Sequence, residues 1–225
     1  MIKNTKTSQS ADDERVYCWE DMYIQAGRIT HYMPNQGNEW SFDPKFKYDC
    51  FGMFGHLRPF GMAPRGVNLW EMDWRRLCGA LSEQFGKAAP NHFEQWWTRS
   101  NVDRLGGYDR FMRPGPGMPT MRELQRGMKR PCIVTQNIKL ADGARDEYLE
   151  WFAKKVKPAA ARVGWQAIVW MGSLHSSFVV TMLAAPDWSR VLDLADAMPQ
   201  PDPGWQADIQ TCSMSAWAGS GFLKR

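Results

Sequence analysis

A short motif that occurs twice along the chain constrains the fold more than any other feature. The segment DWRRL at residues 73–77 matches DWSRV at residues 187–191. Two further pairs of short segments match in the same order, and all three pairs are separated by 111 to 116 residues. A capping residue before an apolar helix is common, so one match would carry little weight. Three matches at nearly one separation indicate two copies of a single structural unit.

The second half gives the clearer pattern of secondary structure. Its apolar residues recur at helical spacing between residues 144 and 163, although Pro158 should kink or interrupt that helix. The β-rich runs around this helix predict strands. The predicted order is a strand at 133–140, a helix at 144–163, strands at 165–171 and 176–184, a helix capped by Asp187 and a strand at 214–223. This β-α-β-β-α-β order is that of a ferredoxin-like unit.

The first half predicts the same unit without its first helix. Strands are expected at 16–24, 49–60 and 67–72, followed by the helix that begins at Asp73. Residues 30–46 stand in place of the missing helix, and their proline and glycine residues break any helical stripe. Long irregular loops inside domains often bind ligands, so this loop is expected to border a pocket. A degenerate helix without a role is the alternative.

Together these patterns predict an α+β fold with two tandem ferredoxin-like units. The expected boundaries are a flexible tail at 1–14, a first unit at 15–114, a linker at 115–131 and a second unit at 132–225.

Composition excludes several classes of partner and site. Five scattered cysteines give no disulfide framework, which favours a reducing, cytoplasmic compartment. No apolar run approaches the ~20 residues of a membrane span, and no zinc signature predicts a metal. The net charge of +4 is dispersed, so no nucleic acid is expected. The 12 tryptophans fit either a bulky core or a pocket for a flat apolar ligand.

The chain resembles the NIPSNAP-like branch of the dimeric α/β-barrel superfamily. The resemblance rests on residues 67–70 running into Asp73, on the Pro158 helix followed by Gly164, and on the ending at 111–113. It implies that the antiparallel sheets of two ferredoxin-like units, here from one chain, form an α/β barrel around a cavity. Members of the superfamily include cofactor-free monooxygenases, isomerases, cyclases, dehydratases and haem-binding enzymes, so the fold does not choose the reaction. The resemblance also admits a homodimer.

Ionisable side chains on strand faces that could line this cavity are the candidate site. Trp19, Asp21 and Tyr23 alternate on one face of the first strand, which we assign to the cavity because the opposite face is more apolar. His56 and Arg58 share a face of the next strand. The predicted catalytic residues are His56, Arg58, Asp21 and Tyr23, and the predicted substrate-binding residues are Trp19, His31, Tyr32, Trp40, Trp70 and His175.

These residue types suit acid/base chemistry without a cofactor. A neutral histidine at position 56 can accept a proton while Asp21 holds its tautomer. Arg58 can stabilise a developing oxyanion or phenolate, and Tyr23 can relay a proton. The first hypothesis is therefore a cofactor-independent lyase or isomerase acting on a small aromatic or phenolic ligand, with His31 or His175 as the next candidate base.

Two alternatives stay open at this stage. One is a haem-binding protein, with His56 or His175 as the axial ligand, or a cofactor-free monooxygenase. The other is a non-catalytic binder of small ligands, in which each of these residues is a satisfied polar group.

Overall fold

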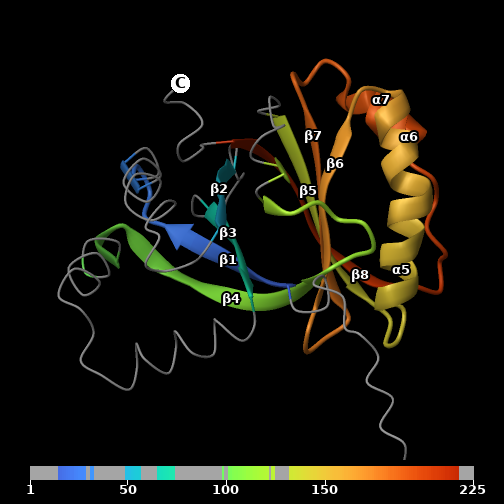
Figure 1. Cartoon of the computed structure of the whole chain (residues 1–225). Coiled ribbons are helices and arrows are strands. Elements are labelled where there is room, and N and C mark those ends of the chain that lie inside the picture. Colours follow the sequence, from blue (N-terminus) through green and yellow to red (C-terminus); the bar gives the residue numbers. More distant parts are fainter. Residues whose placement is uncertain are drawn as a thin grey trace, which may run out of the picture.

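The chain folds as an α+β structure, with antiparallel strands throughout and helices against the second half of the sheet (Figure 1). The computed structural model describes residues 15–28, 31–32, 49–56, 65–73, 98, 101–121, 123–124 and 132–217. For residues 49–56, 73 and 206–217 it defines the backbone path. The predicted α+β class is confirmed.

Eight strands lie in the described part of the chain. They are β1 (Arg15–Ile24), β2 (Asp49–His56), β3 (Arg65–Asp73), β4 (Arg104–Pro114), β5 (Cys132–Leu140), β6 (Gln166–Ser173), β7 (Phe178–Ala185) and β8 (Gln206–Trp217). Two of them are longer than the sequence indicated. Strand β8 starts at Gln206 rather than at residue 214, because its first residues are too polar to read as an apolar run. Strand β4 contains Gly106 and Gly107. Because glycine is a poor strand former, the first half of β4 does not read as a strand in the sequence.

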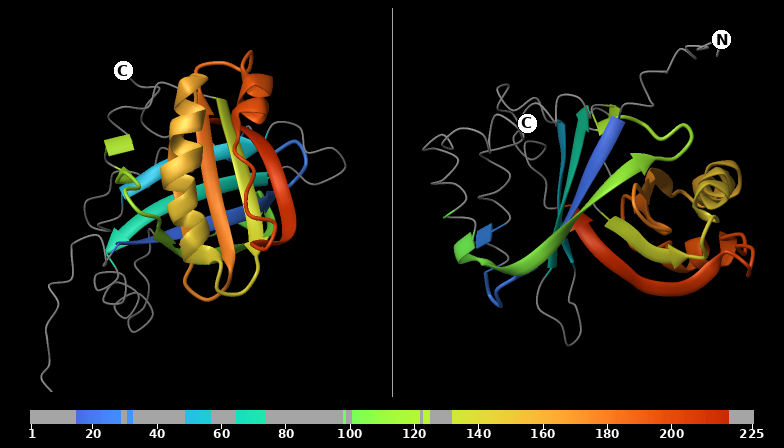
Figure 2. Two further views of the ribbon diagram at one scale, coloured as in Figure 1. Left: turned by 90° about the vertical axis from the view of Figure 1, so that its right-hand side faces the viewer. Right: turned by 90° about the horizontal axis from the view of Figure 1, so that it is seen from below.

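The strands pair in the order β1-β3-β2-β8-β5-β7-β6-β4, and β4 pairs again with β1 to close a barrel. The first four strands have the order β4-β1-β3-β2 and the last four the corresponding order β8-β5-β7-β6. Short pairings join the two sets: Phe54–His56 of β2 with residues 215–217, and residues 112–114 of β4 with 171–173. In Figure 2 the first set, coloured blue to green, crosses the direction of β5 to β7.

Helical residues 145–162 cover the second set of strands, as Figures 1 and 2 show. They comprise α5 (Arg145–Trp151), a π-helical turn η2 (Phe152–Val156) and α6 (Lys157–Arg162). Pro158 does not interrupt this helix, contrary to the expectation. The Lys157 N–H bonds to the Phe152 carbonyl five residues back, so the π turn shifts the hydrogen bonding just before Pro158. Pro158 then occupies the first turn of α6, where a missing N–H costs little.

The last helix, α7 (Val191–Ala197), begins later than the sequence indicated. The Asp187 carboxylate accepts a hydrogen bond from the Ser189 N–H at 2.8 Å, which holds a local turn instead of capping the helix. Among the described helices none combines the length and the apolar character needed to cross a membrane.

One apolar core connects the two sets of strands. It contains Tyr17, Trp19 and Leu69 from the first set together with Trp170 and Val180 from the second. The buried tryptophans are mainly core residues, and two of them also satisfy their N–H groups: Trp165 Nε1 donates to the Arg190 carbonyl at 3.0 Å and Trp170 Nε1 to the Pro116 carbonyl at 3.1 Å. This core fixes the face of β1 that looks into the barrel.

A substitution at Gly107 would test how closely the backbones of β1 and β4 pack. A Cβ at this position would lie 2.4 Å from the Asp21 carbonyl oxygen, whereas a Cβ at Gly106 would meet nothing within 4 Å. Both glycines have a similar positive φ, so Gly106→Ala is a matched control for backbone strain. We expect Gly107→Ala to lower the free energy of unfolding by roughly 1–3 kcal/mol more than Gly106→Ala. Urea denaturation would measure the difference, and equal losses would contradict the close contact.

Candidate functional site

The inner face of β1 carries the residues from which the candidate site is built. Tyr17 and Trp19 belong to the core that the two sets of strands share. Because side chains alternate along a strand, Asp21 and Tyr23 lie on the same face. This is the face that the sequence analysis assigned to the interior.

A buried ion pair between β1 and β3 lies on this face. Asp21 Oδ1 accepts a hydrogen bond from Arg65 Nε at 3.0 Å, and Asp21 Oδ2 accepts a second one from Arg65 Nη2. Asp21 is 2% exposed and Arg65 8%. Burial would lower the pKa of Arg65, but the charge and hydrogen bonds of Asp21 outweigh it and hold that pKa above its ordinary value. Arg65 therefore carries its positive charge at any physiological pH.

Two tyrosines pack around the Arg65 guanidinium. Its carbon lies 5.2 Å from the centre of the Tyr23 ring, and Nη2 donates to the Tyr108 hydroxyl at 3.3 Å. The two tyrosine rings meet edge to face, with their centres 6.4 Å apart. Tyr108 is 39% exposed, so this group of residues extends from the buried ion pair to the solvent.

Arg110 stacks between two aromatic rings beside this group. Its guanidinium carbon lies 4.1 Å from the centre of the Tyr108 ring and 4.1 Å from that of Phe178, which comes from β7. In the described part of the chain no oxygen accepts a hydrogen bond from this guanidinium. Arg110 is the register partner of Trp19, whose buried Nε1 also lacks a hydrogen-bond partner there. We call Asp21, Tyr23, Arg65, Tyr108, Arg110 and Phe178 the interior cluster.

The interior cluster suits a planar anion. The Arg110 guanidinium can donate two parallel hydrogen bonds to a carboxylate or to a phenolate and its neighbouring oxygen. The aromatic rings on both sides hold the guanidinium in one plane and favour a flat ligand. In Arg65 the donors on Nε and Nη2 are already engaged by Asp21 and Tyr108.

The opposite face of β1 and β3 holds a second polar group of residues. Glu20 Oε2 accepts hydrogen bonds from Asn68 Nδ2 at 2.6 Å and from Trp70 Nε1 at 3.2 Å, and Glu20 Oε1 accepts one from Arg104. The Tyr32 hydroxyl donates to Met22 Sδ at 2.6 Å on this face. Burial raises the pKa of Tyr32 well above its ordinary value.

This arrangement corrects one prediction of the sequence analysis. Trp70 pairs with Cys18 and not with Trp19, so it points away from the interior. Tyr32 contacts Met22, which alternates with Asp21 and Tyr23. The structure therefore does not bring Trp70 and Tyr32 together with Trp19 and Tyr23, because the strand register places the two pairs on opposite faces.

His31 has a buried carboxylate partner. Its Nδ1 lies 2.6 Å from Asp103 Oδ2, and Arg28 Nε donates to Asp103 Oδ1 at 2.6 Å. The Asp103 side chain is 3% exposed, whereas that of His31 is 54% exposed. A carboxylate only accepts, so the contact holds the proton on Nδ1 and leaves Nε2 as the basic nitrogen of the neutral ring. Asp103 directly precedes β4 and its carbonyl accepts from the Gln25 N–H, so this pair lies at the same end of β1 as Tyr23.

The remaining predicted residues are placed less fully. His56 ends β2 and pairs with Ser215, and its side chain lies outside the described part. Arg58, Trp40 and most of the 30–46 loop lie outside the described residues as well. His175 lies exposed in the turn between β6 and β7, where its N–H donates to Ser173 Oγ at 3.2 Å. Among the described residues no group of three or more His, Cys, Asp or Glu could hold a metal ion.

Sequence reasoning missed Arg65, Tyr108, Arg110 and Asp103. Arg65 precedes the predicted start of its strand by two residues, so it was not placed on a face. Tyr108, Arg110 and Met112 alternate as a strand should, which is the signal that would have found them.

Of the comparisons with known proteins, only the one with solved structures found similar chains. No family model and no curated protein matches the chain. A candidate monooxygenase from Fusobacterium nucleatum subsp. nucleatum ATCC 25586 is 8% identical with a TM-score of 0.57, covering 91% of this chain and 92% of that one. A candidate monooxygenase from Lactobacillus acidophilus NCFM is 8% identical with a TM-score of 0.54, covering 92% and 98%.

A mutant chlorite dismutase from Candidatus Nitrospira defluvii is also similar, at 10% identity and a TM-score of 0.55, covering 91% of each chain. At these identities the likeness shows a shared fold and nothing beyond it. It does not extend to the NIPSNAP-like branch.

The Asp21–Arg65 pair yields a stability prediction. Asp21→Asn leaves the Arg65 charge buried without its carboxylate, which should lower the free energy of unfolding by roughly 3–5 kcal/mol. Glu150→Gln is the matched control, because it removes a carboxylate from an exposed pair with Lys154 and should cost under about 1 kcal/mol. Urea denaturation of both variants would decide, and similar losses would mean that the Asp21 pair contributes no more than a surface pair.

The Asp103 carboxylate yields a pH prediction. Burial would raise the pKa of Asp103, but hydrogen bonds from His31 and Arg28 lower it below the ordinary value. A depressed pKa in the folded state stabilises the protein above the ordinary aspartate range, and this contribution is lost as the pH falls through the folded pKa. The stability advantage of the parent over Asp103→Asn should therefore shrink between about pH 5 and pH 2. Urea denaturation of the parent and of Asp103→Asn at several pH values would measure this, and an advantage that does not change with pH would contradict it.

Proposed function

We propose that the chain is a cofactor-independent enzyme of the monooxygenase type that acts on a small aromatic or phenolic molecule. The observation that carries this proposal is Arg110, stacked between Tyr108 and Phe178 with no hydrogen-bond acceptor among the described residues. The guanidinium is placed to hold an anion that forms during the reaction. The two similar structures of candidate monooxygenases support the oxygenase hypothesis over a lyase or isomerase.

The reaction begins with loss of a proton from the substrate. A ring-activated CH₂ group gives a carbanion, whose charge spreads onto a ring oxygen that Arg110 can bind. His31 is the candidate base with a described carboxylate partner, since Asp103 orients its ring. His56 remains a predicted base, and it lies on β2, the strand next to the one that carries Arg65.

Dioxygen then serves as the oxidant without a cofactor. The carbanion supplies electrons to O₂, and a C–O bond forms to give a peroxide. Breaking the O–O bond with loss of the second hydrogen leaves a carbonyl carbon and releases water. Overall, CH₂ and O₂ give C=O and H₂O, so the four electrons that O₂ accepts all come from the substrate.

Haem is the cofactor that the wider superfamily suggests, and the described histidines do not fit it. An axial ligand is expected to be enclosed beside the porphyrin, whereas His175 lies exposed in a turn and the His31 side chain is more than half exposed. We therefore derive no step through haem. Titration with haem tests this directly, because stoichiometric uptake with a defined Soret shift that His56→Ala or His175→Ala abolishes would overturn the cofactor-free proposal.

The tandem organisation belongs to this proposal. The orders β4-β1-β3-β2 and β8-β5-β7-β6 support two ferredoxin-like units, at residues 15–114 and 132–225, joined by a linker at 115–131. We also propose that the chain belongs to the NIPSNAP-like branch, that its partner is a single small aromatic ligand, and that it forms a homodimer.

Arg110 provides the direct test of the site. Arg110→Gln should lower kcat/KM by about 10²-fold or more, because one anion-stabilising group is worth that much. Arg110→Lys should restore only part of the activity, since an ammonium group cannot reproduce the planar fork. Arg113→Gln is the control, because it removes the same charge from an exposed position of the same strand. Oxygen uptake with a panel of phenols and ring-activated ketones would be measured, and equal rates for Arg110→Gln and Arg113→Gln would refute the role.

Three variants test the identity of the base. Loss of a general base lowers kcat by about 10²–10⁴-fold. Because Asp103 orients His31, His31→Gln and Asp103→Asn should both lower kcat, whereas His56→Gln should do so only if His56 is the base. Turnover without O₂ consumption would instead identify a lyase or isomerase. Retention of full activity by both histidine variants would exclude both residues as the base.

A further inference from the structure

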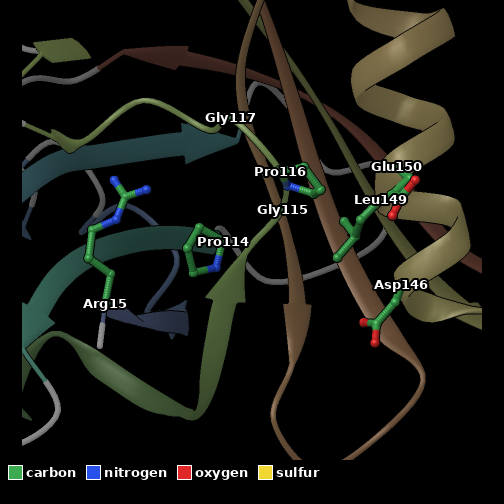
Figure 3. Close-up of a pocket in the computed structure, with 8 residues that line it drawn as sticks. All are labelled: Arg15, Pro114, Gly115, Pro116, Gly117, Asp146, Leu149 and Glu150. Atoms are coloured by element: carbon green, nitrogen blue, oxygen red, sulfur yellow. The ribbon is translucent and has the colours of Figure 1, made fainter. Parts of the chain in front are cut away.

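The pocket drawn in Figure 3, about 310 Å³ in volume, lies at the end of β4 and apart from the interior cluster. Its charged residues, Arg15, Asp146 and Glu150, each bond to other residues of the chain. The charges of this pocket therefore do not point to a ligand. A buried donor that lacks an acceptor lies instead on the inner face of β1, beside Arg110.

Trp19 carries this donor. Its side chain is 1% exposed, and its Nε1–H has no hydrogen-bond acceptor in the described chain. A buried N–H without an acceptor is uncommon, because leaving it unpaired destabilises the folded state. The two other buried tryptophans among the described residues, Trp165 and Trp170, both donate to backbone carbonyls. The Trp19 N–H thus differs from theirs in having a hydrogen bond still to make.

Trp19 and Arg110 can contact the same small ligand. They are register partners on neighbouring strands, so their Cβ atoms lie about 4.5–5.5 Å apart and both side chains lie on the inner face. Arg110 is held between the rings of Tyr108 and Phe178, which fixes the plane of its guanidinium. An anion bound to that guanidinium therefore has Trp19 beside it.

The two side chains recognise different features of a ligand. The Arg110 guanidinium pairs with both oxygens of a carboxylate. The indole N–H of Trp19 only donates, so it requires a lone pair on the ligand. A hydroxyl on the ring carbon next to a carboxylate turns its hydrogen toward the carboxylate and leaves a lone pair facing outward. An amino group on the same carbon presents a second hydrogen in that direction instead.

We propose that Trp19 selects the substrate of this site, which is an aromatic anion with an acceptor oxygen on the ring carbon next to the one that bears its anionic group. Arg110 binds the anionic group, and Trp19 Nε1 donates to the neighbouring oxygen. This inference rests on the proposed function, because it takes Arg110 as the anion-binding residue. It narrows the substrate from aromatic or phenolic molecules in general to those with two neighbouring oxygen-bearing groups.

The test compares four probes by calorimetric titration of the full chain without oxygen: 2-hydroxybenzoate, benzoate, 2-aminobenzoate and 4-hydroxybenzoate. All four carry the carboxylate, and they differ only in the second ring substituent. The 2-hydroxy compound should bind about fivefold more tightly than benzoate, because one further hydrogen bond forms at a buried donor. The 2-amino and 4-hydroxy compounds should bind no more tightly than benzoate. Equal affinities for the 2-hydroxy and 2-amino compounds, or no saturation up to about 10 mM, would overturn the inference.

Variants assign the preference to Trp19. Trp19→Phe removes the N–H and keeps an aromatic ring, so the preference for 2-hydroxybenzoate over benzoate should disappear. Trp165→Phe is the matched control, because it removes an N–H from an equally buried tryptophan and should keep the preference. Arg110→Gln should weaken the binding of every probe by about tenfold or more. A preference that persists in Trp19→Phe would overturn the inference. If Trp19→Phe does not fold, the comparison of the 2-hydroxy and 2-amino compounds on the parent chain still decides.

Oxygen uptake separates this inference from the proposed function. If the binding preference depends on Trp19 but no phenol with a neighbouring oxygen group causes oxygen uptake, the ligand class stands and the monooxygenase proposal fails. If oxygen uptake occurs at equal rates with phenols whose second oxygen is neighbouring or distant, in the parent and in Trp19→Phe alike, the monooxygenase proposal stands and the role of Trp19 is refuted.

Discussion

The buried pair of Asp21 and Arg65 sets the chemistry of the barrel interior. A carboxylate that is 2% exposed is tolerated only with a close partner, so Asp21 requires Arg65 opposite it. Arg65 in turn fixes the Tyr108 hydroxyl and one face of Tyr23. With Tyr108 held, Arg110 two residues along β4 has one ring on which to stack and meets Phe178 on its other side. The position of a candidate anion-binding group thus depends on an ion pair in which Asp21 and Tyr108 engage Nε and Nη2 of Arg65.

The two faces of the first set of strands differ in their balance of hydrogen-bond donors and acceptors. On the outer face, the Glu20 carboxylate accepts hydrogen bonds from Asn68, Trp70 and Arg104. Asp109 lies opposite Glu20 in register, and burial together with the Glu20 charge raises the pKa of Asp109. On the inner face the balance is reversed, because the Trp19 N–H and the Arg110 guanidinium are donors without acceptors in the described residues. An excess of donors facing an interior is what an anionic ligand would complete.

Much of the fold could be predicted because the spacing of apolar and polar residues along an element follows the environment of its faces. The helical stripe from Tyr148 to Val163 reflects one buried face. Strand β1 is buried on both faces, so the alternation of Trp19, Asp21 and Tyr23 separates a polar-aromatic face from a more apolar one. Register between strands is not contained in either pattern. Whether Leu69 or Trp70 lies beside Trp19 depends on where β1 and β3 are paired, and a shift of one residue exchanges the two. The sequence analysis therefore grouped Trp70 with the Trp19 face of β1, and it did not place Arg65, which lies at the edge of its strand.

Strand β4 changes its pairing partners along its length. Among the described strands its first half pairs with β1 alone, since its pairing with β6 begins at Met112, and here Tyr108 is partly open to solvent. Its last residues are fixed by β6, and the chain that follows is locked to Trp170. An open edge beside a stacked arginine suits a site that substrate must enter and product must leave. The change from one pairing partner to two along a single strand is the structural reason for expecting chemistry in the first half of β4 rather than at its fixed end.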